Sequence, residues 1–434
     1  METNIRRTCQ WFEQLNQYSG PVFNQALNAQ PGGNTVKSDK RANLHFDSRA
    51  VYLPPDEASK SINPPIFMSS SFQYDADIYQ QVVDGERKAV NIYGRCGNPS
   101  EYQFEEQMMM IEGADACLAT ASGMAAISVT LLGLLKGGDH VVCDWTTYSS
   151  THEMLDHRYT DYSIETTFVD TADAAAVRAA MRPNTKVIYF ETIANPTMKI
   201  SAIPPLVEIA TQSGAILVCD NTFASPYVAR PLEWGVDIVV ESATKFIGGH
   251  SDALGGAICM KSDRLPVDFL EQIRWNTMVK LGSPLAPFNA WLLLRGIQTL
   301  SVRVQRQCQS TAKLATFFES HPAIGKVWYP GLSSHPQHEI AKAQIPEFGG
   351  MLTFEVSDAD AALRVLDNLE LACFAASLGG VRTTTQIPAS MAFLDVPEQQ
   401  RQVMNIADGM IRVSTGLEDV DDLIADFDAA LTKV

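Results

Sequence analysis

Residues 215–245 read AILVCDNTFASPYVARPLEWGVDIVVESATK. Two apolar runs of strand length lie in this stretch. The first ends at Asp220, and the second leads into Ser242, Thr244 and Lys245. Short apolar runs bounded by turn residues predict buried strands. Parallel strands present their carboxyl ends at one edge, where open α/β sheets bind ligands. We therefore expect Asp220 and Lys245 to lie close together at that edge.

The same pattern extends in both directions from this stretch. Further apolar runs alternate with helical stretches such as GMAAISVTLLGLL, and they cover residues 116–121, 140–145, 166–170, 186–191 and 255–260. Strands separated by helices predict an α/β fold whose mostly parallel sheet is covered on both faces.

The character of the sequence changes after about residue 285. Long helical patterns, broken near Gly296, precede a smaller unit of alternating strands and helices, with expected strands at 349–356, 373–378 and 410–417. Residues 1–43 are polar and rich in turn residues, so we expect them to be poorly ordered or to lie against a partner. We divide the chain into an N-terminal extension with an inter-subunit segment, a ligand-binding α/β domain and a C-terminal α+β domain, at residues 1–64, 65–290 and 291–434.

Composition excludes several classes of function. The 434 residues include 33 Lys and Arg against 50 Asp and Glu, which gives a formal charge of −17. The sequence has no local basic patch of the kind that a nucleic-acid-binding surface would need. No apolar run is long enough for a transmembrane helix, and the N-terminus lacks the pattern of a secretory signal. The eight cysteines are scattered without a CxxC pair, which indicates free thiols in the cytoplasm and no metal site.

The side chains at the strand ends match the needs of one cofactor. Pyridoxal phosphate requires an acid for its ring nitrogen and a lysine for its aldehyde, which Asp220 and Lys245 could supply. Ser122, Gly123 and Met124 stand where an expected strand turns into a helix, which is a natural site for a phosphate. Acids and lysines at strand ends also occur in other α/β proteins, so this pattern alone leaves the assignment open.

Motifs along the chain resemble those of a known family. SATKFIGGHSDALGGA (242–257) resembles the lysine signature of the Cys/Met-metabolism pyridoxal-phosphate enzymes. The other motifs follow in the family's order: INPPIFMSSSF (62–72), Tyr93 to Arg95 with Asn98-Pro99, ATASGMAAI (119–127), ETIANPT (191–197), CDNTFASP (219–226), WYPGL (328–332), SLGG (377–380) and IRVSTGLED (411–419). This family includes cystathionine γ-synthases, cystathionine γ-lyases, methionine γ-lyases and O-acetylhomoserine sulfhydrylases. The resemblance implies a fold-type-I pyridoxal-phosphate enzyme.

The resemblance also implies roles for individual residues. Lys245 would form the Schiff base with the cofactor and then move protons, and Asp220 would keep the ring nitrogen protonated. Tyr148 would stack on the ring and assist proton transfer near the leaving group, and Asn195 would contact the ring hydroxyl. The remaining cofactor-binding residues of the same chain, most of them around the phosphate, would be Ser122, Gly123, Met124, Thr222, Ser242 and Thr244.

Two further groups of residues complete the implied site. Tyr93 and Arg95 would reach the phosphate from the neighbouring subunit, in a homotetramer built from dimers that share active sites. Ser377 and Arg412 would bind the α-carboxylate of a small amino-acid substrate, because the planar guanidinium suits a bidentate pair.

Two departures from the family pattern guide the choice of reaction. Arg382 stands where the family usually has an acid, which favours an anionic or neutral substrate end over a distal ammonium, unless Arg382 points to solvent. Ser150 stands where methionine γ-lyases typically have a cysteine. These departures favour γ-replacement on an O-activated homoserine. The alternatives are γ-elimination from methionine, homocysteine or cystathionine, β-elimination from cystathionine, an aminotransferase of the same fold, and a non-catalytic homologue.

Overall fold

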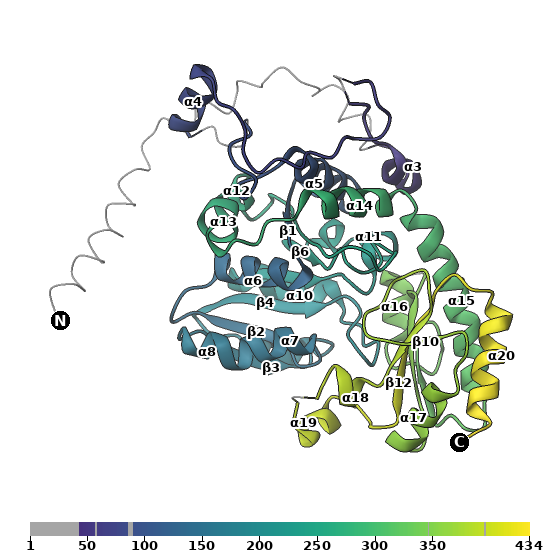
Figure 1. Ribbon diagram of the computed structural model, residues 1–434. Coiled ribbons are helices and arrows are strands. Elements are labelled where there is room, and N and C mark those ends of the chain that lie inside the picture. The colour runs from purple at the N-terminus through teal and green to yellow at the C-terminus, as the bar shows by residue number, and fades with distance from the viewer. Residues whose placement is uncertain (1–42, 57–58, 86–89, 346, 395) are drawn as a thin grey trace. The chain divides into compact units, whose positions relative to one another are not determined.

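Seven strands form one sheet, and they coincide with the seven apolar runs between residues 116 and 260 (Figure 1). Across the sheet they are β1 (Ala116–Thr120), β7 (Gly256–Met260), β6 (Ile238–Glu241), β5 (Ile216–Asp220), β4 (Thr185–Glu191), β2 (His140–Asp144) and β3 (Glu165–Val169). Strands β6, β5, β4, β2 and β3 pair in parallel, whereas β7 is antiparallel to both of its neighbours. The predicted α/β fold with a mostly parallel sheet is therefore confirmed.

The computed structural model describes residues 43–434 apart from 57–58, 86–89, 346 and 395. The predicted behaviour of residues 1–43 concerns almost entirely residues that lie outside this part of the chain. Residues Leu44–Val434 form one compact unit. The boundary expected near residue 290 falls within a helix and stays a prediction.

The helices of the described residues connect and flank the strands. In chain order they are α3 (Phe46–Val51), α4 (Ala76–Val83), α5 (Pro99–Glu112), α6 (Gly123–Leu134), α7 (Ser149–Glu153), α8 (Tyr159–Asp161), α9 (Ala174–Ala180), α10 (Ile203–Ser213), α11 (Ser225–Val228), α12 (Phe269–Ile273), α13 (Val279–Leu281), α14 (Pro287–Ile297), α15 (Leu300–Ser320), α16 (His338–Gln344), α17 (Ala359–Asp367), α18 (Pro388–Met391), α19 (Glu398–Val403) and α20 (Val420–Leu431).

Both faces of the first sheet are covered by helices. Phe104 of α5 and Leu293 of α14 belong to the apolar core on one face, and Ile127 of α6 and Ile273 of α12 belong to the core on the other. Successive strand side chains alternate between these two cores, as the pleat of a strand requires. Burial on both faces explains why the strands read as continuous apolar runs.

The long helical region after residue 285 is interrupted between α14 and α15, close to Gly296 as expected. A Cβ atom at Gly296 would lie 2.5 Å from the carbonyl oxygen of Gly248. Glycine therefore allows α14 to pack directly against the backbone that follows Lys245. This contact supports the loop that carries the predicted catalytic lysine.

A second sheet follows α15. Across the sheet its strands are β10 (Cys373–Phe374), β11 (Thr384–Gln386), β12 (Met410–Ser414), β9 (Met351–Glu355) and β8 (Lys326–Trp328). Helices α15, α17 and α20 pack against it (Figure 1). The rings of Phe318, Phe354 and Phe427 lie at the centre of this core, with centroids 4.4 to 6.1 Å apart. The strand expected at 373–378 is shorter than predicted, and β8 and β11 were missed because three residues show no clear periodicity.

None of the helices among the described residues is long and apolar enough to span a bilayer. The seven cysteines that the structure describes form no disulfide bond with one another, and Cys9 lies outside the described residues. Within the same part of the chain, no group of three or more His, Cys, Asp or Glu side chains could hold a metal ion.

Two acids, Glu112 at the end of α5 and Glu241 at the end of β6, are buried at 0% and 1% exposure. Burial raises the pKa of Glu112 from 4.5 to about 7, and burial together with the charge of Glu112 raises the pKa of Glu241. Between pH 4.5 and about pH 7 the folded chain retains a proton on Glu112 that the unfolded chain releases. The free energy of unfolding therefore falls as the pH rises through this window.

The Glu112→Gln variant is expected to be more stable than the wild type above about pH 7, because the amide never ionises. The gain should shrink toward about pH 5, where Glu112 of the wild type is also protonated in the folded chain. Thermal unfolding midpoints measured at both pH values check this. Glu153→Gln, at an exposed acid, is the matched control. A gain of equal size at both pH values would contradict the prediction.

Candidate active site

A cavity of about 530 Å³ opens at the carboxyl ends of β4, β5 and β6. Its volume is typical of sites for small ligands. The structure brings most of the predicted site residues together here, and the lining includes Ser122, Gly123, Met124, Tyr148, Asn195, Asp220, Thr222, Ser242, Thr244, Lys245, Ser377 and Arg412.

One end of the cavity is a cradle for an anion. Helix α6 begins there directly after β1, and its N-cap Ser122 accepts a hydrogen bond from the Ala125 N–H at 3.1 Å. The N–H groups of the first helical turn have no partners within the helix, so they favour a bound anion. A Cβ atom at Gly123 would lie 2.6 Å from the Cβ atom of Ser242. Glycine at this position therefore lets the helix approach the Ser242 hydroxyl closely.

Thr244 has a different set of contacts from the one that a phosphate ligand would need. Its hydroxyl donates to the Gly255 carbonyl at 3.2 Å and accepts from the Gly255 N–H at 3.0 Å. Its proton is therefore already used to hold the loop of Lys245 against β7. Within this geometry Thr244 would have to break that bond before it could donate to a phosphate.

Lys245 lines the cavity, and its ammonium group loses a proton more easily than that of an ordinary lysine. Burial, and then the charge of Arg412, lower its pKa to about 8. Its Nζ atom donates to the Ser377 hydroxyl at 2.8 Å. A primary amine with this pKa is partly neutral near physiological pH, so it can act as a nucleophile or a base.

Asp220 is a half-buried acid at the end of β5. It accepts the Thr222 N–H at 3.0 Å and the Tyr189 hydroxyl at 3.3 Å. Burial raises its pKa in spite of these bonds. A positive charge placed in the cavity beside Asp220 would offset that cost of burial.

Arg412 closes the cavity from the side of β12. Its guanidinium donates to Asn195 Oδ1 at 3.1 Å, to the Ser377 carbonyl at 3.1 Å and to Gln386 Oε1 at 2.8 Å. Burial lowers its pKa to about 10, and its Nε atom has no hydrogen-bond partner among the described residues. A buried guanidinium without a facing carboxylate is suited to bind one from a ligand.

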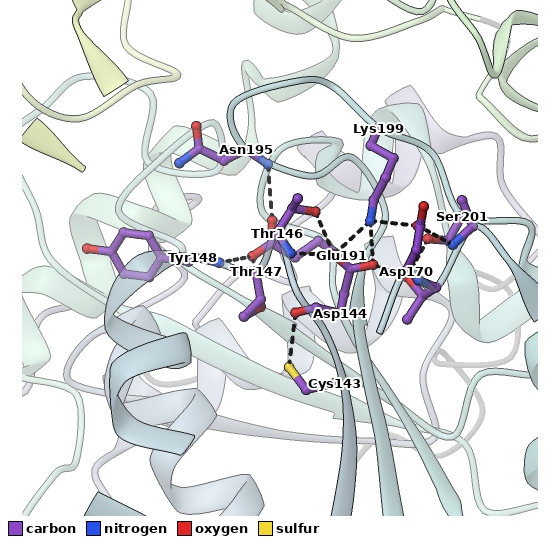
Figure 2. Close-up of polar contacts among 12 residues, drawn as sticks. Cys143, Asp144, Thr146, Thr147, Tyr148, Asp170, Glu191, Asn195, Lys199 and Ser201 are labelled. Carbon is purple, nitrogen blue, oxygen red and sulfur yellow. Dashed lines mark hydrogen bonds and ion pairs between the residues drawn. The ribbon is translucent and has the colours of Figure 1, made fainter. Parts of the chain in front are cut away.

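Glu191, at the end of β4, connects two walls of the cavity (Figure 2). Its Oε1 atom accepts the backbone N–H of Tyr148 at 2.6 Å, and its Oε2 atom accepts the backbone N–H of Asn195 at 3.3 Å. Burial, followed by the charge of Asp220, raises the pKa of Glu191 well above its usual range.

Three predicted residues do not line the cavity of the described chain. Arg95 donates to the Val279 carbonyl at 2.7 Å, and Tyr93 is 44% exposed, so their expected role across a subunit boundary stays a prediction. Arg382 is exposed, because its neighbour Thr383 is bound to Glu418 through both its N–H, at 2.7 Å, and its hydroxyl, at 2.8 Å. This exposure agrees with the alternative that Arg382 points to solvent, and its contact with substrate stays a prediction.

The residues of the cavity wall that sequence reasoning overlooked include Glu191, Phe223 and Gln386. Glu191 pairs in register with Asp220 and ends its strand in the same way, so the rule that selected Asp220 would have found it. Phe223 lies under the Arg412 guanidinium, 5.7 Å from ring centroid to Cζ. Gln386 belongs to β11, a strand too short to be predicted.

The model of the family described as Cys/Met metabolism PLP-dependent enzyme matches residues 50–432. The chain belongs to this family. Curated relatives include the L-methionine gamma-lyase of Fusobacterium nucleatum, which is 40% identical over 85% of this chain and 93% of its own. Another is the cystathionine beta-lyase MetC of Bacillus subtilis, which is 41% identical over 90% of this chain and 97% of its own.

Solved structures agree with membership of the Cys/Met metabolism family. MetB from Corynebacterium glutamicum has a TM-score of 0.84 and 35% identity, and the match covers 91% of this chain and 99% of that one. A putative O-acetylhomoserine (thiol)-lyase from Campylobacter jejuni has a TM-score of 0.86 and 31% identity, over 90% of this chain and 100% of that one, and contains N'-pyridoxyl-lysine-5'-monophosphate. This protein is therefore an enzyme of the lyase and synthase group, and its cofactor is pyridoxal 5'-phosphate.

The cavity fits the cofactor of the Cys/Met metabolism family. The N-terminus of α6 and the Ser242 hydroxyl form the anion cradle that its phosphate needs. Lys245 offers an amine with a lowered pKa to its aldehyde, and Asp220 offers a half-buried carboxyl group to its ring nitrogen. The orphaned Nε atom of Arg412 leaves a donor for the carboxylate of an amino acid.

Proposed function

We propose that the enzyme breaks the bond between Cγ and its substituent in an L-amino acid whose substituent is small and uncharged. The methylthio group of methionine is such a substituent, and its elimination with water gives methanethiol, ammonia and 2-oxobutanoate. One observation carries this proposal. The acidic and basic side chains that line the cavity in the described residues are Glu191, Asp220, Lys245 and Arg412. The Glu191 carboxyl accepts the backbone N–H groups of Tyr148 and Asn195, and the other three are assigned to the cofactor or the α-carboxylate.

The rest of the wall suits such a substituent. Leu254, Ala376, Leu378, Met391 and Ala392 line it without a charge. A distal ammonium or carboxylate, as in cystathionine, would lose its hydration there without gaining an ionic partner from the same chain. The methionine-lyase and cystathionine-lyase relatives support carbon–sulfur chemistry in general, and this wall supports the smaller substrate.

The geometry assigns steps to the residues of the chain. Arg412, which already donates to the Ser377 carbonyl, holds the α-carboxylate. When bound, pyridoxal phosphate withdraws electrons from Cα of the amino acid. The Lys245 amine would then take the proton from Cα and pass it to C4′ of the cofactor, which leaves the amine neutral again to take a proton from Cβ. Its bond to the Ser377 hydroxyl, at 2.8 Å, fixes the position of the amine on the wall where Arg412 also binds the Ser377 carbonyl.

The leaving group also needs a proton. The Tyr148 side chain lines the cavity and is 41% exposed, so its phenol can protonate a departing thiolate. Asp220 stabilises a protonated ring nitrogen throughout, because the two opposite charges share a buried site.

γ-Replacement on an O-activated homoserine is the second candidate. Ser150, a hydroxyl where methionine γ-lyases typically have a thiol, lines the cavity and favours it. The other motivation for this reaction gains no support, because Arg382 is exposed and does not line the cavity of the described residues. The balance of observations therefore favours elimination over the replacement that the sequence suggested.

Self-association belongs to the same proposal. We propose that Tyr93 and Arg95 complete the phosphate site of a second copy, in a homotetramer of dimers. Exposed apolar side chains in the same region, Met68 at 72% and Tyr79 at 61%, support a covered surface there. The buried free thiols of Cys143 and Cys219 support a reducing, cytoplasmic location.

The products of the purified holoenzyme test the reaction. We expect methionine to yield 2-oxobutanoate and methanethiol, and O-acetylhomoserine to yield 2-oxobutanoate with or without an added thiol. Mass spectrometry and a 2-oxo acid assay measure both. A thioether that forms only when a thiol is added, with no product from methionine, would instead establish replacement. Conversion of the cofactor to its amine form by an amino acid alone would indicate an aminotransferase.

A further inference from the structure

Glu191 stands between two loops that meet at the cavity. The loop after β2 carries Tyr148, and the loop after β4 carries Asn195 (Figure 2). One carboxyl group accepts a backbone N–H from each loop, at 2.6 Å and 3.3 Å. Glu191 is 6% exposed, so neither bond is exchanged easily for a bond to water.

Asn195 extends this connection to the substrate side. Its side-chain oxygen accepts a hydrogen bond from Arg412 Nη1 at 3.1 Å, and Gln386 holds the other nitrogen of the same guanidinium at 2.8 Å. The position of Asn195 therefore helps to set the orientation of Arg412, which we have assigned to the α-carboxylate. A small displacement of such a group costs much of the benefit of a fixed geometry.

We infer that Glu191 is a positioning residue that fixes Tyr148 on one side of the cofactor site and, through Asn195, Arg412 on the other. The inference rests on the proposed carboxylate role of Arg412. It does not depend on which group leaves Cγ. The Thr147 hydroxyl also donates to Oε1 of Glu191, at 3.4 Å, and the other two contacts are made by backbone N–H groups. The carboxyl of Glu191 therefore fixes the backbone from which the side chains of Tyr148 and Asn195 extend.

A second, deeper group of contacts holds the same loops (Figure 2). Lys199, whose side chain is 10% exposed, binds Asp144 at 2.7 Å and Asp170 at 2.9 Å. Asp144 also accepts the Thr146 N–H at 2.7 Å. Because these contacts anchor both loops behind the cavity, the loops stay folded when Glu191 is replaced. A change at Glu191 therefore alters alignment without unfolding the loops.

Two variants of Glu191 separate its bonds. Glu191→Gln keeps one acceptor oxygen but presents an NH₂ group to the second backbone N–H. Glu191→Met has a similar length and removes both acceptors. The matched control is Asp237→Asn, at a 4%-exposed acid that accepts the Leu217 N–H at 2.8 Å and pairs with Arg264 at the opposite edge of the sheet. Thermal midpoints of all three variants report the purely structural cost.

The readouts do not require turnover. Glycine has an α-carboxylate but no γ-carbon, so its dissociation constant, from the visible spectrum of the holoenzyme, reports the Arg412 side alone. Visible circular dichroism of the bound cofactor reports the Tyr148 side. We expect glycine to bind about tenfold more weakly to Glu191→Gln and weaker still to Glu191→Met. The dichroism should change most in Glu191→Met, and Asp237→Asn should change neither signal.

Several results would overturn the inference. One is glycine affinity and dichroism in both Glu191 variants within about twofold of the wild type. Another is an equal change in Asp237→Asn, which would mean that the signals follow stability. If the wild type gives no γ-elimination product but glycine binds more weakly to the Glu191 variants, the proposed reaction is wrong and the positioning role of Glu191 stands. If the wild type gives the γ-elimination products but the glycine dissociation constant is unchanged in the Glu191 variants, the positioning role is wrong and the proposed reaction stands.

Discussion

Replacement of Lys245 by alanine is expected to lower kcat by at least about a thousandfold. Lys245 has the only amine that lines the cavity in the described residues, and in the proposed function it would also supply the covalent link to the cofactor. Its pKa of about 8 suits it to accept a proton from carbon and return it near neutral pH. The phosphate cradle and Asp220 remain, so the variant should still bind the cofactor, but without a covalent bond.

Steady-state kinetics and the visible spectrum of the loaded variant measure the two halves of this prediction. Lys261→Ala is the matched control, because Lys261 forms a partly exposed ion pair with Asp115 at 3.2 Å and lies away from the cavity. Activity of Lys245→Ala close to that of Lys261→Ala would exclude Lys245 as the general base. Partial recovery of activity with an added small amine would strengthen the assignment.

Replacement of Arg274 by methionine is expected to destabilise the fold by about 3 to 5 kcal/mol. The Arg274 guanidinium is 1% exposed and contacts Glu101 at 3.1 Å and Glu105 at 2.6 Å. It also contacts Glu271 at 3.2 Å. Methionine has a similar volume but leaves the two buried carboxylates without their cation. The loss of the cation therefore dominates over the loss of packing.

Denaturant unfolding of the wild type and the variant measures this effect. Arg178→Met is the control, because the pair of Arg178 with Glu208 is exposed and contributes at most about 1 kcal/mol. Adding Glu101→Gln and Glu105→Gln to Arg274→Met should recover part of the loss, since no unpaired charge is then buried. A loss for Arg274→Met as small as that for Arg178→Met would show that the acids become protonated at little cost.

The sequence predicts the first sheet well because its strands are buried on both faces. Runs such as AILVC and DIVVE must be apolar throughout, so their positions are visible without an alignment. The sequence does not show that β7 is antiparallel to its neighbours, because an apolar run looks the same for a strand that points in either direction in the sheet. The short β8 and β11 depend on contacts across their own sheet, which no local pattern reports.

The residues of the candidate site also differ in how far a local pattern predicts them. Residues at strand ends and at the start of α6, such as Asp220 and Gly123, follow from local pattern, and the structure places them around one cavity. Arg382 could not be placed, because its direction depends on a bond between Thr383 and the distant Glu418. In the same way, the Thr244 hydroxyl has no proton left for a phosphate because it donates to the Gly255 carbonyl, next to β7. Such long-range contacts decide what a side chain does, and only the fold reveals them.

The bond between Asn195 and Arg412 joins the two sheets, because Asn195 follows a strand of the first and Arg412 lies in a strand of the second. The groups that hold the cofactor come from the first sheet, whereas Met391, Ala392 and Gln386 belong to the second sheet and its connections. Part of the wall that faces the substituent therefore comes from a stretch after residue 370 that is separate from the groups assigned to the cofactor. Substitutions in that stretch can change the fit to a leaving group while those cofactor groups stay in place.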